Sequence, residues 1–130
     1  MTDEKLLAAF EAATLTYKQF THRAHVNVAW LYVRDFTLPV ASEKFIRHLK
    51  ALNKVHGVSA NYHETITWFM LLLIADRQGK NPVVTFEDFE ANNSDMMRDA
   101  KGLLARYYKD ETLWGDHARR CFTLPDKLAL

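Results

Sequence analysis

The chain has 130 residues, of which 48% are hydrophobic and 25% are charged, a composition typical of a soluble globular protein rather than of a disordered one. This length fits one domain and leaves no room for a second independent core. The 17 basic and 16 acidic residues give a net charge of +1, so we expect no nucleic-acid partner, because such proteins carry a clear basic excess. Cys121 is the only cysteine, which excludes an internal disulfide framework.

Two features of the sequence predict a cytoplasmic protein with no membrane partner. Residues 1–12 have the pattern of an amphipathic helix and lack the basic and apolar regions of a signal peptide. The longest apolar run extends from Ile66 to Ala75 and includes Thr67. This run is too short to cross a bilayer, because a spanning helix needs about 20 apolar residues.

Apolar residues recur at helical spacing along most of the chain, and no alternating strand pattern is longer than four residues. Capping boxes at Thr16–Gln19 and Asn61–Glu64 predict helix starts, and Gly57 and Gly79 predict helix ends. We expect helices over residues 3–13, 17–35, 40–55, 61–78, 85–90, 95–108 and 111–122.

This pattern predicts an all-α fold, a single-domain bundle of five to six helices over residues 1–130, the short helix 85–90 not being counted. Short connections join the helices 17–35, 40–55 and 61–78, so we expect them to run up, down and up. The predicted core consists of Trp30, Leu31, Val33, Phe45, Leu49, Trp68, Leu72, Leu73, Leu103 and Leu104.

Histidines stand at the beginning of two of these helices. His22 and His25 continue the apolar face of helix 17–35 at its N-terminal end, at the i, i+3 spacing that places both on one side. His63 lies near the start of helix 61–78, with Glu64 beside it. The up-down-up arrangement brings both N-terminal ends to the same end of the bundle, so we expect these four side chains to face one another.

Imidazoles and a carboxylate at such a point are ligands for a divalent transition metal such as Zn, Fe or Cu. Our first hypothesis is therefore a metalloprotein with His22, His25, His63 and Glu64 as ligands, acting as a metal-dependent enzyme on a small-molecule substrate. In this hypothesis Glu64 is the fourth ligand or the general base, and Tyr62 and Thr67 orient the bound molecule.

A second hypothesis explains the same residues without a metal. Here the histidines are structural, Glu64 only completes the cap that begins at Asn61, and the protein is a non-catalytic helical interaction module or a homodimer. Known motifs do not decide between the two hypotheses. The zincin motif is incomplete because Thr67 stands where its second histidine would be, and no Glu-x-x-His pair of the di-iron bundles occurs.

Several segments resemble a group of small bacterial all-α proteins for which no activity is established, so the resemblance implies a fold but no reaction. The resemblance covers most of the chain and lies in Phe20-Thr-His22-Arg-Ala-His25, Ala29-Trp30-Leu-Tyr32, Tyr62-His63-Glu64-Thr65-Ile-Thr67, Leu104-Ala-Arg-Tyr107-Tyr108 and Pro125-Asp126. The metal hypothesis is also similar to the DinB-type helical bundles, which hold a metal with three histidines from two helices. This sequence departs from that pattern, because its histidine pair is on the earlier helix and its single histidine on the later one.

Overall fold

The computed structural model describes residues 1–128, so the last two residues of the predicted domain 1–130 lie outside the described part. The all-α prediction is confirmed, and the described residues contain these helices: α1 (Asp3–Glu11), α2 (His22–Asp35), α3 (Leu38–Val55), the 3₁₀ turn η1 (Ser59–Asn61), α4 (Glu64–Lys80), α5 (Phe86–Asn92), α6 (Ser94–Arg98), α7 (Ala100–Tyr107), α8 (Asp110–Leu113) and α9 (Asp116–Arg120). Within residues 1–128, no helix is both long and apolar enough to cross a membrane.

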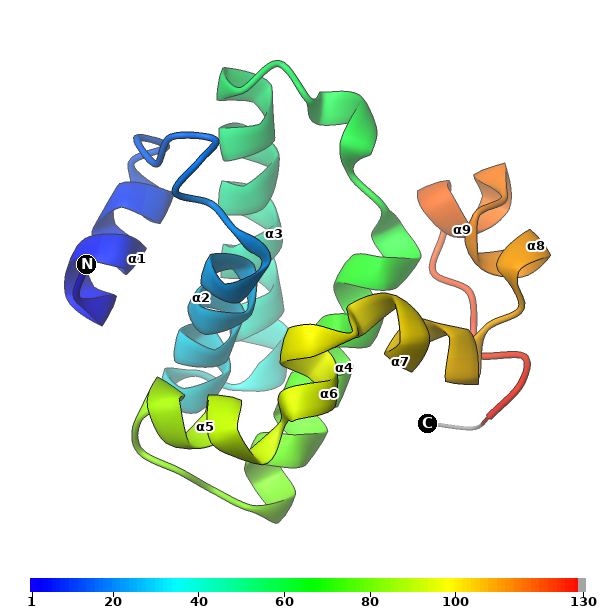
Figure 1. Cartoon of the computed structure of the whole chain (residues 1–130). Coiled ribbons are helices and arrows are strands. Elements are labelled where there is room, and N and C mark those ends of the chain that lie inside the picture. The colour runs from blue at the N-terminus through cyan, green and yellow to red at the C-terminus, as the bar shows by residue number, and fades with distance from the viewer. Residues whose placement is uncertain (129–130) are drawn as a thin grey trace.

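Helices α2, α3 and α4 form the centre of the bundle and run in alternating directions, as predicted (Figure 1). The starts of α2 and α4 therefore lie at the same end as the end of α3. Helix α1 packs on α2 and α3, while α5 and α6 pack against α2. The short helix α9 packs on α4, so the last helices lie beside the start of α4 (Figure 1).

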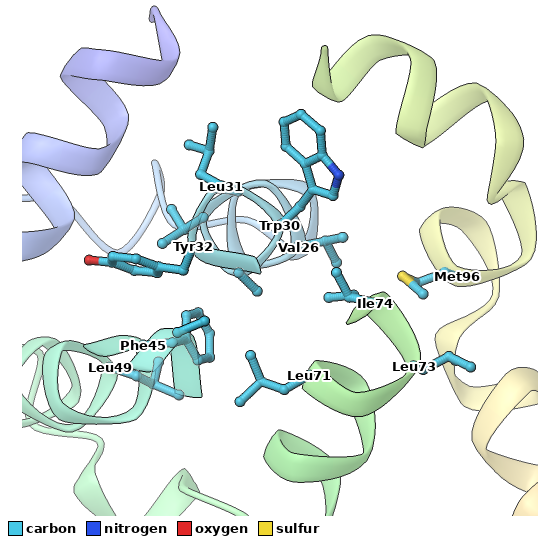
Figure 2. Close-up of a cluster of buried hydrophobic side chains, with 14 of the residues drawn as sticks. Val26, Trp30, Leu31, Tyr32, Phe45, Leu49, Leu71, Leu73, Ile74 and Met96 are labelled. Carbon is cyan, nitrogen blue, oxygen red and sulfur yellow. The ribbon is translucent and has the colours of Figure 1, made fainter. Parts of the chain in front are cut away.

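Helix α2 is buried around most of its circumference, which the sequence pattern did not predict. Eight of its residues are buried: Ala24, Val26, Asn27, Val28, Ala29, Trp30, Leu31 and Tyr32. Figure 2 shows Val26, Leu31 and Tyr32 leaving this helix in different directions. The predicted apolar face was too narrow because α2 is the central helix and contacts α1, α3, α4, α5 and α6.

Most of the predicted core is buried, with exceptions on α2 and α4. Val33, Trp68 and Leu72 are only partly buried, whereas Leu71 is 1% exposed. Leu71 points toward Phe45 and Leu49 of α3 in Figure 2. On α4 the predicted Leu73 is buried, but Leu71 takes the place predicted for Leu72, because this helix is apolar on several sides and its sequence does not mark which leucine faces α3.

Local hydrogen bonds explain where the helix boundaries differ from those predicted. Thr16 and Gln19 form the predicted reciprocal capping bonds, but these close a single turn, and α2 begins later with Thr21 as its cap. The predicted helix 95–108 is divided at Asp99, whose carboxylate caps α7 by accepting from the N–H of Gly102. Similarly, the predicted helix 111–122 is two short helices, α8 and α9. Gly57 has a φ of +71°, the left-handed conformation predicted for it after α3.

Candidate functional site

His63 caps α4 and also binds the C-terminal helices. Its Nδ1 accepts a hydrogen bond from the N–H of Ile66 at 3.2 Å, so His63 replaces the predicted cap Asn61. Its Nε2–H donates to the carbonyl oxygen of Leu113, the last residue of α8, at 2.7 Å. Burial lowers the pKa of the His63 ring, which favours the neutral form that these two bonds require. Both ring nitrogens are occupied, so His63 has no lone pair left for a metal ion.

His22 and His25 also bond to backbone carbonyl groups. The Nε2–H of His22 donates to Met96 and the Nδ1–H of His25 donates to Thr21, each at 2.9 Å. A carbonyl oxygen only accepts, so each bond fixes which ring nitrogen carries the proton. The His25 ring stacks on Phe20 with 3.6 Å between centroids, and burial lowers the pKa of His25. His25 is therefore a neutral ring near pH 7, and its Nε2 has no hydrogen-bond partner among residues 1–128.

This geometry does not support the predicted metal site of His22, His25, His63 and Glu64. The topology brings the starts of α2 and α4 to one end of the bundle, as expected, but the three rings bond to carbonyl groups of three different segments. In the described part of the chain, no group of three or more His, Cys, Asp or Glu side chains is arranged to hold a metal ion.

Glu64 has a different partner from those predicted for it. Its carboxylate accepts a hydrogen bond from the phenol of Tyr62 at 2.6 Å. Burial and this bond raise the pKa of Tyr62, which therefore stays protonated. Glu64 lines neither of the two cavities described next. The carboxylate orients Tyr62, and the geometry gives no support to Glu64 as a metal ligand or a general base.

A cavity of about 670 Å³ lies where the starts of α2 and α4 meet the end of α3 and the α8–α9 segment; we call it the outer cavity. Its aromatic lining comes from Tyr17, Phe20, His25, His56, Tyr62, His63 and Trp114. Tyr17 is 68% exposed and Trp114 is 48% exposed, so the outer cavity reaches the protein surface beside these two side chains.

A second cavity of about 350 Å³, the inner cavity, lies between α2, α3, α4 and α7. Its lining is mainly apolar and includes Val26, Ala29, Phe45, Met70, Ile74 and Leu104. The two cavities adjoin, because four residues line both of them: His25, Leu49, Ile66 and Thr67. Together they form a space whose lining is aromatic and polar in the outer cavity and mainly apolar in the inner cavity.

The charged side chains that line this space in the described part of the chain are basic and not acidic. Arg119 of α9 lines the outer cavity, and its guanidinium contributes to the lowered pKa of His63. Within residues 1–128, neither cavity is lined by an aspartate or a glutamate. The outer cavity therefore has one fixed positive charge and neutral hydrogen-bonding groups around it.

Five of the six predicted site residues lie at these cavities. His25 and Thr67 line both, Tyr62 and His63 line the outer one, and His22 lines the inner one. The sequence did not predict Arg119 or Trp114 as site residues. No pattern placed the short C-terminal helices on α4, and the hydrogen bond from His63 to Leu113 that holds them there joins residues far apart in the chain.

Comparisons with protein-family models, with curated proteins and with solved structures find no significant match for this chain.

Proposed function

We propose that this protein binds a small amphiphilic organic molecule in the adjoining outer and inner cavities. The observation that carries this proposal is the change of lining along one space, from aromatic and polar groups at Tyr17 and Trp114 to apolar groups at Phe45 and Ile74. The volume of the outer cavity is within the range of about 300–1,000 Å³ that is usual for small-molecule sites. A ligand with one polar and one apolar end matches both linings.

The junction of the two cavities offers groups that orient such a ligand. The free Nε2 of His25 accepts a hydrogen bond from a hydroxyl or protonated group of the ligand. The hydroxyl of Thr67 donates to the carbonyl of His63 at 2.8 Å, and its oxygen retains a lone pair for a second bond. Leu49 and Ile66 contribute the apolar part of this junction.

Catalysis through Glu64 does not form part of this proposal, because Glu64 bonds to Tyr62 and faces neither cavity. The homodimer predicted as an alternative stays a prediction.

Calorimetric titration with 1-decanol, a neutral amphiphile, tests the proposed function. We expect one molecule to bind per chain. Ile66→Phe adds volume where the two cavities adjoin and should weaken binding about tenfold or more, since the larger side chain occupies ligand space. The matched control is Ile46→Phe, at a partly buried isoleucine that lines neither cavity, and it should bind like the wild type. Absence of decanol binding, or equal loss in both variants, would contradict the proposal.

A further inference from the structure

Arg119 differs from the other arginines of the chain in its surroundings. Among residues 1–128, five arginines form salt bridges with carboxylates: Arg23, Arg34, Arg47, Arg77 and Arg106. Arg98 and Arg120 form no such bridge with these described residues and are exposed at the surface. Arg119 is partly buried and lines a cavity, yet no carboxylate of residues 1–128 lies within salt-bridge distance.

The hydrogen bonding of Arg119 is also incomplete. Its one side-chain hydrogen bond among the described residues is a long one, 3.5 Å from Nη1 to the carbonyl oxygen of Ala60. A guanidinium has five N–H donors arranged as a planar fork that fits a carboxylate with two parallel bonds. The other donors of Arg119 have no hydrogen-bond partner among residues 1–128, and the described lining of the outer cavity holds no carboxylate to compensate the positive charge.

The rest of the lining determines what kind of anion fits. A small inorganic anion would use the charge of Arg119 but none of the apolar lining of the inner cavity, which adjoins the outer cavity at Leu49 and Ile66. Arg119 lines only the outer cavity, so the charged end of a ligand belongs there and the apolar end belongs in the inner cavity. A planar carboxylate also matches the guanidinium fork.

We infer that the ligand is an amphiphilic carboxylic acid whose carboxylate pairs with Arg119 in the outer cavity and whose apolar chain enters the inner cavity. This inference rests on the proposed function, because it names the chemical class of the molecule that the two cavities bind.

Three probes with the same chain and different head groups test the charge preference: decanoate, 1-decanol and decyltrimethylammonium. Below their micellar concentrations, we expect decanoate to bind about tenfold or more tightly than decanol, and the cationic probe to bind weakest, since only the carboxylate pairs with Arg119. Arg119→Gln should reduce decanoate affinity to the level of decanol and leave decanol binding unchanged. Arg119→Lys keeps the charge without the fork and should show an intermediate loss.

Arg120→Gln is the matched control, because it removes the same charge from the exposed neighbouring residue. It should change decanoate affinity less than about twofold, the small effect expected of an exposed and screened charge. Equal affinities for the three probes, or equal effects of Arg119→Gln and Arg120→Gln on decanoate affinity, would overturn the inference. The proposed function would still stand in that case, provided that decanol binds. If none of the three probes binds, both the inference and the proposed function are wrong.

Discussion

The hydroxyl of Thr65 donates a hydrogen bond to the carbonyl oxygen of Ala118, and the two oxygens lie 2.6 Å apart. The same Oγ1 lies 3.0 Å from the carbonyl oxygen of Cys121 and accepts from the N–H of Thr123 at 3.1 Å. Thr65 is completely buried. One side chain in the first turn of α4 thus holds α9 and the segment after it, and so positions Arg119 at the outer cavity.

Thr65→Val keeps the shape of this side chain and removes its hydroxyl. We expect a loss of about 1–3 kcal/mol in the free energy of unfolding, because buried backbone groups lose their partner. Amide hydrogen exchange over residues 116–123 should accelerate, since these residues lose their attachment to α4. Thr67→Val is the control: its hydroxyl donates to the carbonyl of the cap residue His63 and not to α9 or the segment after it, so the loss should be smaller and the C-terminal exchange unchanged. Similar exchange in both variants would show that Thr65 does not hold the segment.

His63→Leu separates the structural role of His63 from the metal-site hypothesis. The variant leaves the N–H of Ile66 and the carbonyl of Leu113 without partners, so we expect a loss of about 1–3 kcal/mol in unfolding free energy. Glu64→Gln should lower the free energy of unfolding by less, because Glu64 is only partly buried and the amide oxygen of the introduced glutamine still accepts the hydrogen bond from Tyr62. Elemental analysis of the purified proteins supplies the second readout. Near-equimolar metal in the wild type that is lost in both variants would restore the metal-site hypothesis.

The sequence predicted the topology well because it depends on local signals. Thr2 and Thr85 cap α1 and α5, Gly57 ends α3 as predicted, and short connections fix the alternating directions. The same topology correctly placed His25 and His63 at one end of the bundle, where both line the outer cavity.

The prediction of the site was limited because the histidines bond to backbone carbonyl groups, and a sequence does not show which carbonyl groups lie near them. Each histidine bonds to a carbonyl group whose position depends on tertiary packing, such as Met96 for His22 and Leu113 for His63. Likewise, Arg119 reaches the outer cavity through the bonds of Thr65, which join residues far apart in the chain. Residue spacing within one helix therefore identified candidate side chains but not their partners.

Leu71 and Leu72 test which face of α4 packs into the core. Leu71 is 1% exposed and Leu72 is only partly buried. Leu71→Ala should lower the free energy of unfolding by about 2–5 kcal/mol, since it leaves a cavity in the core. Leu72→Ala should cost clearly less, as judged by urea denaturation of both proteins. A larger loss for Leu72→Ala would show that Leu72, as predicted from the sequence, packs in the core in place of Leu71.

Stability should fall as the pH is lowered from 7 toward 5. In the folded protein, mainly because of burial, the pKa values of His25, His48 and His63 lie below the ordinary value of about 6.5. Above this value the rings are neutral in both states. As the pH falls through it, the unfolded chain takes up protons first, so unfolding becomes more favourable until the folded pKa values are reached.

Urea denaturation at pH 7.5 and pH 5.5 measures this dependence, with His25→Gln as the comparison. The variant lacks one of the three groups and should lose less stability between the two pH values, since it takes up one proton fewer on unfolding. Stability that increases on acidification would mean that the protonated rings are favoured in the folded protein.

The central claim is that a small amphiphile occupies the two adjoining cavities with its apolar end inward. Intermolecular NOEs between 1-decanol and isotopically labelled protein test it most directly. We predict NOEs from the terminal methyl group of decanol to Ile74 and Met70 in the inner cavity, and from the carbon beside its hydroxyl to Phe20 and Trp114 in the outer one. NOEs confined to an exposed apolar side chain such as Leu124, or the reverse orientation in the cavities, would contradict the account.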